Sequence, residues 1–437
     1  MHGLRHKDIY RNPDRYRRAV ADINRLLERA GHTHGLQLSL ANYQDPTLSP
    51  LKSDDLRKSA THYKKNIFFR FFAPRLDQLL TEQKGPVGIS LNYLSQALTS
   101  FALIGYLKKQ YPERTIILGG GLVTTWLSNP DWQNPFADLV DHFISGRGEA
   151  PLLRLLGKTA LNQPIMPDYT SLIEKNYLSP GFILPYTTSF GCFWKKCSFC
   201  PEKSEDNPYT QVPVEQALSD LAQLTETNQP AMIHFLDNAI SPATLQALAS
   251  KPPGIPWYGF ARMDQLLTDT DFCKKLRASG CIMLKLGLES GDQAVLDGMN
   301  KGIDLQLARQ VLANLHQAEI GTYIYLLFGT PQETEVSARA TMAFVEEMAG
   351  TISFLNLAIF NLPRNSQETA ELALSEFYEG DLSIYSDFCH PHGWNRPQVR
   401  RFLDTEFKRS PRIASILRRD PPFFTSNHAP FLLTLGR

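Results

Sequence analysis

The feature that most constrains the fold is a regular alternation of short apolar runs and helical stretches over residues 182–361. A typical helical stretch follows Asp304, a residue type that caps helices at their first turn. Strand and helix in alternation predict a parallel sheet covered by helices. Since there are six such units and a closed barrel needs eight, we predict a partial (β/α)6 barrel. The apolar runs lie at 182–188, 232–236, 256–260, 282–288, 322–328 and 354–360.

A second, less regular alternation precedes this region. Strand-like runs occupy 36–40, 87–91, 115–118 and 139–145, and a helical pattern covers 99–110. Glycine-rich turns follow the last two runs. This pattern predicts an α/β fold with a doubly wound, Rossmann-like sheet, in which ligands bind beyond the carboxyl ends of the strands.

Changes in composition, together with the positions of proline and glycine residues, divide the chain into four predicted parts. Residues 1–156 hold an N-terminal helix at 12–31 and the Rossmann-like domain, and residues 157–181 form a polar, proline-containing linker. Residues 182–361 form the barrel. Residues 362–437 are aromatic and basic in parts, and we expect a small extension that covers the barrel mouth.

The bulk composition excludes several classes of protein. The net charge is +1 over 437 residues, so no broad surface for nucleic acid is expected. No apolar run approaches the roughly 20 residues that span a bilayer, and no secretory signal is visible, so no membrane partner is expected. Six cysteines are too few for a disulfide scaffold in a chain of this length. These observations predict a cytoplasmic protein.

Three of the six cysteines form a C-x4-C-x2-C motif directly after the first barrel strand. Cys192, Cys197 and Cys200 can hold three corners of a [4Fe–4S] cluster, whereas ferredoxin-type clusters use four cysteines. The fourth iron then keeps a position open for a small molecule. The motif also lies at the carboxyl end of a strand, where barrel enzymes place their chemistry.

Other readings of these cysteines remain open. A structural zinc ion needs a fourth ligand, which Cys389, His390 or His392 could supply if the tail folds back. A redox-active disulfide and an accidental group of core cysteines are further alternatives. The remaining Cys273 and Cys281 fit the core of a helix and a strand.

Further motifs, in a fixed order, make residues 85–361 resemble the radical S-adenosylmethionine (SAM) superfamily. The resemblance is greatest to the branch with an N-terminal cobalamin (B12)-binding-type domain. The cluster loop matches with one departure, because the family's usual spacing is C-x3-C-x2-C. The other matching segments are Phe-Leu-Asp-Asn at 235–238, Arg-Met-Asp at 262–264, Gly-Leu-Glu-Ser-Gly at 287–291 and Leu-Phe-Gly-Thr-Pro-Gln-Glu-Thr at 327–334.

The resemblance implies cofactor-binding roles for Asp237, Arg262, Glu289, Ser290 and Gly329. Their chemistry agrees, since a carboxylate and a hydroxyl can bind ribose or an amino group, and arginine can bind a carboxylate. Glycine lets the backbone approach a flat ring closely. Each position also has a plainer reading: Glu289 could pair with a lysine at 285 or 301, Arg262 could form a surface ion pair, and Gly329 could be a simple turn.

For the N-terminal domain, the resemblance implies that Ser90, Gly119, Gly120 and Gly148 lie around cobalamin. The Asp-x-His-x-x-Gly signature, whose histidine ligates cobalt, is absent from the sequence. Two options follow: the domain binds cobalamin without a histidine ligand, or it has lost cobalamin.

The resemblance implies that the reduced cluster cleaves SAM to a 5′-deoxyadenosyl radical, with flavodoxin or ferredoxin as electron donor. It favours cobalamin-dependent methylation of an unactivated carbon. The alternatives are a radical enzyme with a vestigial cobalamin domain, catalysing rearrangement, cyclisation or sulfur insertion, and a zinc-stabilised binding protein without catalysis. The sequence identifies neither a catalytic residue nor the organic or peptide substrate.

Overall fold

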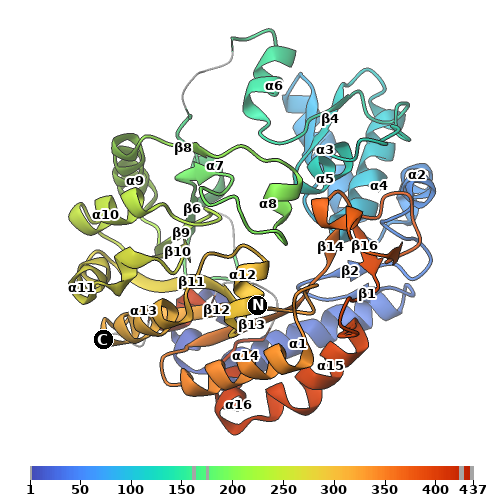
Figure 1. Ribbon diagram of the computed structural model, residues 1–437. Helices are drawn as coiled ribbons and strands as arrows, with labels where there is room; N and C mark the ends of the chain where they lie inside the picture. The colour runs from blue at the N-terminus through green and yellow to red at the C-terminus, as the bar shows by residue number, and fades with distance from the viewer. Residues whose placement is uncertain (1, 160–163, 174–176, 423–427, 434–437) are drawn as a thin grey trace. The chain divides into compact units, whose positions relative to one another are not determined.

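A computed structural model describes residues 2–159, 164–173, 177–422 and 428–433 (Figure 1). The contacts within the chain define two compact units. Unit 1 comprises Met1–Asp22, Gln163–Phe360 and Cys389–Arg437, and unit 2 comprises Ile23–Asn162 and Asn361–Phe388. Each unit is described by itself.

Unit 1 is built on a six-stranded parallel sheet, as the alternation of strand and helix predicts (Figure 1). The strands follow one another in the sheet in sequence order, so each helical connection returns the chain to the next position. The sheet confirms the predicted α/β class. Its strands are β6 (Ile183–Tyr186), β9 (Met232–Phe235), β10 (Trp257–Ala261), β11 (Cys281–Glu289), β12 (Gly321–Phe328) and β13 (Phe354–Ile359).

Helices connect these strands and begin where the sequence places capping residues. Ser241 accepts a hydrogen bond from the Thr244 N–H, and the Asp304 carboxylate accepts two from the first turn of its helix. Such bonds satisfy amide groups that have no partner inside the helix. The connecting helices are α9 (Val214–Asn228), α10 (Pro242–Ser250), α11 (Thr270–Ala278), α12 (Gln293–Gly298), α13 (Leu305–Gln317) and α14 (Glu335–Glu347).

The two faces of this sheet are packed differently. Alternate side chains on one face, such as Trp257, Leu286 and Phe328, form the main core with the helices. The opposite, inner face carries a smaller apolar cluster at the amino ends of its strands, where α17 (Ala429–Leu432) packs. The apolar side chains of that cluster include Met232, Tyr258, Met283, Tyr323 and Phe354.

The terminal segments of unit 1 are helical. Helix α1 (Pro13–His32), of which residues 13–22 belong to unit 1, matches the predicted helix at 12–31. Tyr16 near its start packs edge-on against Phe431 of α17. In the C-terminal part, α15 (Arg396–Thr405) and α16 (Pro411–Leu417) cover the outer core, and Phe407 contacts Phe328 at a centroid distance of 5.3 Å.

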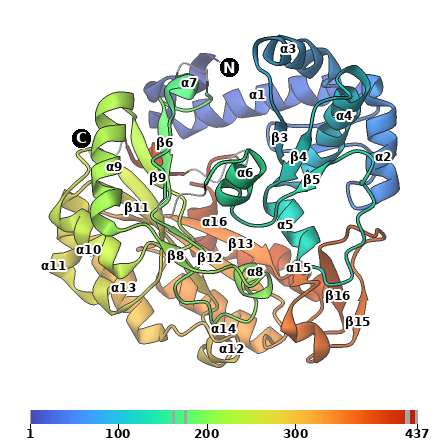
Figure 2. The same ribbon diagram turned by 90° about the horizontal axis from the view of Figure 1, so that it is seen from above.

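Unit 2 contains a parallel sheet of β3 (Val87–Ser90), β4 (Ile116–Gly119) and β5 (His142–Phe143), in that order (Figure 2). This sheet confirms the predicted Rossmann-like character. The predicted strand at 36–40 is different: β1 (Gln37–Leu38) pairs antiparallel with β2 (Tyr43–Gln44) in a separate hairpin. The helices of the unit are α2 (Ser53–Thr61), α3 (Phe69–Glu82), α4 (Leu94–Gln110), α5 (Gly121–Leu127) and α6 (Glu149–Leu155).

Residues 361–388 also belong to unit 2, although the sequence places them in one extension with the tail. They form an antiparallel sheet of β14 (Leu362–Pro363), β16 (Tyr385–Phe388) and β15 (Leu374–Glu376).

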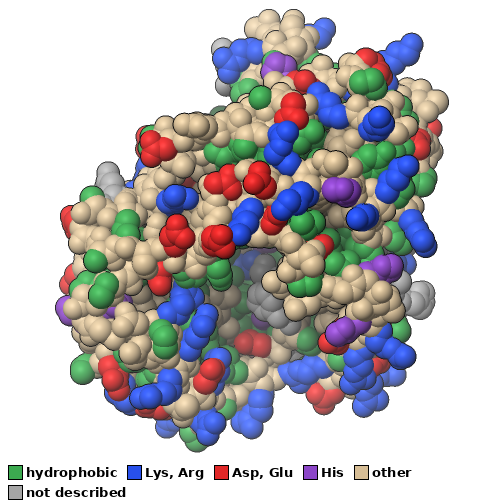
Figure 3. Space-filling view, turned by 90° about the vertical axis from the view of Figure 1, so that its right-hand side faces the viewer, with side chains coloured by type: hydrophobic (Ala, Val, Ile, Leu, Met, Phe, Trp, Pro, Cys, Tyr) green, Lys and Arg blue, Asp and Glu red, His purple; other side chains and the backbone are tan. Residues whose placement is uncertain are grey.

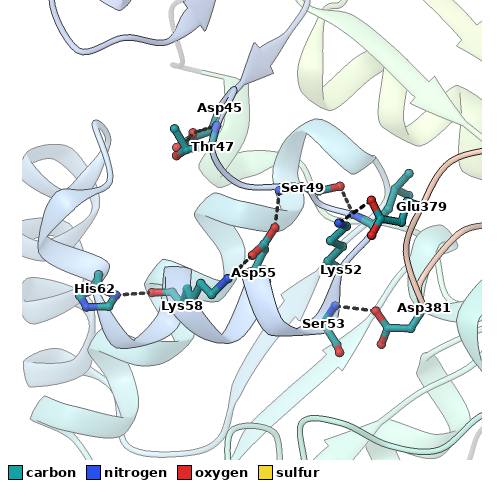
Figure 4. Close-up of polar contacts among 11 residues, drawn as sticks. Asp45, Thr47, Ser49, Lys52, Ser53, Asp55, Lys58, His62, Glu379 and Asp381 are labelled. Atoms are coloured by element: carbon teal, nitrogen blue, oxygen red, sulfur yellow. Dashed lines mark hydrogen bonds and ion pairs between the residues drawn. The ribbon is translucent and has the colours of Figure 1, made fainter.

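The loop before β16 joins this segment to helix α2 (Figure 4). The Ser53 N–H donates to the Asp381 carboxylate over 2.9 Å, and Lys52 pairs with Glu379 at 3.0 Å. The Leu382 N–H donates to the Leu51 carbonyl over 2.9 Å. The predicted extension over 362–437 is therefore divided between the two units. Long-range contacts decide this division, and local sequence patterns do not report them.

Charged side chains of both signs are interspersed on the face shown in Figure 3, as expected for a net charge of +1. Within the described ranges, no helix is long and apolar enough to cross a membrane. The predicted linker at 157–181 lies partly outside the described residues, at 160–163 and 174–176.

Candidate functional site

The three cysteines of the C-x4-C-x2-C motif lie on one loop of unit 1, just beyond the carboxyl end of β6. A short antiparallel ribbon of β7 (Ser189–Phe190) and β8 (Thr210–Gln211) closes this cluster loop at its base. Gly191 begins the loop with φ +70°, and a Cβ there would lie 2.6 Å from the Pro208 carbonyl oxygen. The glycine before the first cysteine is therefore required by the backbone.

The cluster loop is held against the segment that follows helix α12. The Ser198 N–H donates to the Met299 carbonyl over 3.0 Å, and the Trp194 indole N–H donates to the Asn300 carbonyl over 3.2 Å. Gly302, with φ +65°, packs directly under the Trp194 ring, where a Cβ would overlap it. Trp194 therefore anchors the loop.

Two cations and one carboxylate lie beside the loop. The Arg262 guanidinium stacks on the Trp194 ring at 4.1 Å and donates to the Lys301 carbonyl over 2.7 Å. Lys301 Nζ pairs with Glu289 Oε1 at 2.7 Å, and both side chains are about a tenth exposed. The sequence allows Glu289 to pair with Lys285 or Lys301, and in the structure it pairs with Lys301. Arg262 makes no surface ion pair among the described residues.

Glu289 adopts an unusual backbone conformation. Its φ is +69°, and the register between β11 and β12 shifts between Gly287 and Glu289. Left-handed backbone is costly for a residue with a side chain, and such strain is typical of functional sites. The bulge carries the carboxylate to the carboxyl edge of the sheet, beside the cluster loop.

The electrostatic surroundings of the thiols act in opposite directions. Burial raises the pKa of Cys200 to about 11 and also raises the pKa of Cys197. Lys301 and Arg262 lower the pKa of Cys197, because they stabilise the thiolate. A bound metal centre requires the thiolate form and offsets the burial of the thiols.

The three thiols of the loop are donors of the kind that an iron–sulfur cluster takes, with each cysteine binding its own iron at a separate corner. Among the described residues, no group of three or more His, Cys, Asp or Glu side chains is placed to hold one metal ion. A tetrahedral zinc ion would need a fourth ligand beside the three thiols. In addition, His390 is already bonded to the Thr330 carbonyl, at 2.8 Å.

The side chains of two predicted cofactor-binding residues of unit 1 form hydrogen bonds with other residues of the chain. The Asp237 carboxylate is 1% exposed and accepts hydrogen bonds from the Thr188 N–H and from the hydroxyls of Thr188 and Ser189. It thereby fixes the strand end that leads into the cluster loop. Ser290 is fully buried, and its hydroxyl contacts Thr341 at 3.1 Å. Direct contacts of these two residues with a cofactor remain predictions.

The turn after β12 depends on a buried carboxylate that was not among the predicted site residues. Gly329 has φ +78°, and its N–H donates to the Glu333 carboxylate. The Trp394 indole N–H donates to the same carboxylate over 2.9 Å. Burial raises the pKa of Glu333 to about 7. Glu333 lies in the quoted motif at 327–334, whereas no sequence signal points to Trp394.

In unit 2, the predicted residues lie at the carboxyl edge of the three-stranded sheet. Ser90 ends β3, Gly119 ends β4, and Gly120 precedes α5 with φ +107°. Gly148 precedes α6 after β5. Asn92, which the sequence did not single out, links this edge: it donates to the Ser90 hydroxyl over 3.1 Å and accepts from the first amide of α5.

This edge fits cobalamin in part. Ser90 is exposed, and a Cβ at Gly148 would meet no atom within 4 Å, so there is open space for a ligand. At Gly120, by contrast, the backbone itself requires glycine, because a Cβ there would lie 2.5 Å from the Leu91 carbonyl oxygen. The edge offers hydroxyl and backbone groups but, in the absence of the histidine signature, no evident cobalt ligand from the protein.

Comparison with curated proteins gives one informative relative, and no family model matches the chain. The relative is the bacteriochlorophyllide d C-12(1)-methyltransferase of Chlorobaculum tepidum, with 26% identity over 196 residues. The aligned region is 43% of this chain and 40% of that relative, so this chain matches less than half of the relative's length.

Solved structures give a broader match to the fold. The radical SAM methyltransferase TsrM from Kitasatospora setae, with tryptophan substrate and a SAM analogue bound, matches with a TM-score of 0.60 and 15% identity over 90% of this chain and 93% of TsrM. The cobalamin-dependent radical SAM enzyme OxsB, with aqua-cobalamin bound, matches with a TM-score of 0.59 and 14% identity over 80% of this chain and 61% of OxsB. This chain therefore has the same fold as TsrM and OxsB.

Proposed function

We propose that this protein is a radical SAM enzyme in which Cys192, Cys197 and Cys200 hold a [4Fe–4S] cluster, and that it methylates an unactivated carbon with the help of cobalamin. SAM, an organic or peptide substrate and a small electron-donor protein are the partners of this reaction. The relatives with the same fold act with SAM and cobalamin, which supports the proposal.

One observation carries the proposal: the three-cysteine loop lies at the carboxyl edge of a six-stranded parallel sheet, beside a buried Lys301–Glu289 pair. Barrel enzymes build their active sites at this edge. Three thiols with no fourth cysteine nearby in the sequence leave one iron open for SAM.

The chain's own residues would position SAM rather than react with it. When bound, the cluster supplies the electron that cleaves SAM to a 5′-deoxyadenosyl radical. Glu289 offers a carboxylate to the amino or ribose groups of SAM, and Arg262 offers a guanidinium to its carboxylate. Gly329 leaves the backbone after β12 free to approach the adenine. The rings of Phe193, Trp194 and Phe199 limit access of water to the cluster.

In unit 2, Ser90, Gly119 and Gly148 would hold cobalamin through hydroxyl and backbone contacts. When bound, cobalamin supplies the methyl group. Since the sequence lacks the cobalt-ligating histidine, a second function has specific support: a radical SAM enzyme whose cobalamin domain is vestigial and whose reaction is a rearrangement, a cyclisation or a sulfur insertion.

The test is anaerobic reconstitution of the full chain with iron and sulfide, followed by incubation with SAM and a reductant, with and without cobalamin. We expect about four irons and four sulfides per chain and formation of 5′-deoxyadenosine. Alanine at 192, 197 or 200 should reduce the 5′-deoxyadenosine yield at least about 100-fold, because a cluster ligand is lost. The matched control is Cys389→Ala, since Cys389 is an exposed free cysteine.

Four outcomes separate the hypotheses. Cobalamin that stays bound through gel filtration supports the methyltransferase, and its loss together with SAM cleavage supports the vestigial alternative. Stoichiometric zinc without iron would contradict both. A cluster that survives replacement of all three cysteines would contradict the assigned ligands.

A further inference from the structure

Lys285 is a buried cation in the middle of strand β11. Its side chain is on the inner face of the six-stranded sheet, and the residue is only 2% exposed. It forms no ion pair with any residue that the structure describes; its neighbours are His234 and two aromatic rings. A charged group in such a place is normally paired, because burial of an unpaired charge is unfavourable.

The immediate neighbours of Lys285 are neutral. Its Nζ lies 3.4 Å from His234 Nε2, 5.4 Å from the centre of the Tyr258 ring and 5.0 Å from that of Phe260. The His234 ring stacks on Tyr258 at 4.4 Å with an interplanar angle of 10°. The two aromatic faces stabilise the ammonium group by cation–π contacts but do not neutralise it.

The two ends of the inner face differ in how tightly their side chains are packed. At the amino ends of the strands, Tyr258, Tyr323 and Phe354 pack with α17. Toward the carboxyl ends, the inward-facing residues keep part of their surface exposed instead of forming a core. These residues are His234, Phe260, Gly287, Tyr325, Leu327 and Asn356. A molecule that enters from the edge carrying Glu289 and the cluster loop therefore meets Tyr325, which is level with Gly287, before it reaches Phe260 and Lys285, which are level with each other.

We propose that Lys285 binds the carboxylate of an aromatic substrate whose flat body packs against the rings of Phe260 and Tyr325, which contact each other at a centroid distance of 5.0 Å. This inference rests on the proposed function and specifies the substrate class for that same site. The ammonium group supplies the missing ion pair, and the rings supply the apolar walls. The carboxylate points away from the cluster loop, so the rest of the substrate extends toward the edge where SAM would be cleaved.

A monoanion fits better than a phosphate. Lys285 is the sole Lys or Arg among the inward-facing residues of β9–β13 that the structure describes. Lys301 does not provide a second charge, because it is paired with Glu289 at 2.7 Å. Arg262 follows the end of β10 and lies beside the cluster loop, where the proposed function assigns it to SAM. One unpaired cation neutralises one carboxylate.

The titration of this site gives an independent readout. Burial lowers the pKa of Lys285 to about 8, and burial together with Lys285 lowers that of His234 to about 3. Burial raises the pKa values of Tyr323 and Tyr325. Between pH 6 and pH 9, Lys285 is therefore the neighbouring group expected to change charge, and carboxylate binding should weaken as the pH rises through 8.

The experiment is calorimetric titration of the anaerobically reconstituted full chain. The probes are indole-3-acetate, 1-naphthoate and 4-phenylbenzoate, each compared with its uncharged amide. At pH 7 we expect at least one carboxylate to bind at least tenfold more tightly than its amide. At pH 9.5 this preference should fall to threefold or less, whereas amide binding should not change.

Variants assign the preference to one residue. Lys285→Met should remove it, and Lys285→Arg should retain part of it, because the charge is kept. The matched control is Lys274→Met, which replaces an exposed lysine on α11 and should keep the full preference. Should Lys285→Met fail to fold, the pH dependence of the wild type still decides the question.

Equal binding of carboxylates and amides, or no binding of any carboxylate probe, would overturn the inference. Failure of the proposed function gives a different result. A chain that takes up no iron but still shows the Lys285-dependent preference retains the inferred binding site without the radical chemistry. A chain that forms 5′-deoxyadenosine but shows no preference retains the radical chemistry and loses the inference.

Discussion

The two parallel sheets of this protein present very different carboxyl edges. In unit 1, the edge is built from charged and polar side chains, including the Lys301–Glu289 pair and the buried Glu333. In unit 2, the edge is built from glycines, an exposed serine and backbone groups, and the contacts of Asn92 link its turns. Both lie where an α/β fold places its ligands.

The difference indicates how each edge could recognise a ligand. A buried ion pair tolerates substitution poorly, because removal of one partner leaves the other charge buried without compensation. Glycines instead provide space and backbone groups. We infer that unit 1 tolerates few substitutions at its edge, and that unit 2 tolerates most substitutions except those that fill a close backbone contact.

The largest effect is expected for Glu289→Gln. The change leaves Lys301 buried at 9% exposure without its carboxylate, which should reduce the free energy of unfolding by about 3 kcal/mol. Urea denaturation, with hydrogen exchange of β11, measures the loss. The control is Asp271→Asn, which breaks an exposed pair with Lys274 and should change stability by less than about 0.5 kcal/mol. Equal losses in both variants would contradict the comparison.

A smaller effect is expected for Gly120→Ala in unit 2. The residue has φ +107°, and a Cβ there would lie 2.5 Å from the Leu91 carbonyl oxygen. Strain and overpacking together should reduce stability by about 2 kcal/mol. Faster hydrogen exchange of β3 and β4 would show that the loss is local. Gly88→Ala, where a Cβ meets no atom within 4 Å, should remain within about 0.5 kcal/mol of wild type.

Glu333 provides a pH-dependent test of the buried edge. Burial raises the pKa of Glu333 to about 7, above the ordinary 4.5, so the folded state holds a proton that the unfolded state has released. Its contribution to stability is therefore full below pH 4.5 and decreases as the pH rises to 7, by about 1–3 kcal/mol.

Glu333→Gln should remove this contribution, because the amide does not titrate. The measurement is the free energy of unfolding of both proteins at intervals from pH 4.5 to 7.5. The difference between variant and wild type cancels other titrating groups, such as Asp420. A difference that does not depend on pH would show that the Glu333 carboxyl has an ordinary pKa.

The smallest structural effect is expected for Ser90→Ala. The serine is exposed, so stability should change by less than about 0.5 kcal/mol. If the proposed cobalamin site is correct, loss of one hydrogen bond should weaken cobalamin binding about fivefold, measured by equilibrium dialysis. Unchanged cobalamin affinity would remove Ser90 from the site, whereas a large loss of stability would contradict the open character of this edge.

Much of the fold of unit 1 was predictable because its signals are local. Strand-length apolar runs and capping residues such as Asp304 influence only residues a few positions away in the chain. The strands and helices of the structure lie where these signals place them. Unit 2 was harder, because short strands such as His142–Phe143 carry little periodic signal. The run at 36–40 illustrates this limit, since an apolar run does not specify which sheet a strand joins.

The site was predictable to a lesser degree. The spacing of the three cysteines identified the loop, because these residues lie in one short segment of the chain. The partner of Glu289 could not be chosen between two lysines on sequence grounds. Trp394 is 61 residues from the Glu333 that it contacts, so no local pattern could link them.

The sequence by itself determined the order of strands and helices and the position of the cysteine loop. Each of these depends on residues that are near one another in the chain. Only the tertiary structure decided that Lys301 is paired and Lys285 is not, and that residues 361–388 belong to unit 2. These features depend on which distant side chains become neighbours after folding, and burial then fixes the cost of leaving a charge unpaired.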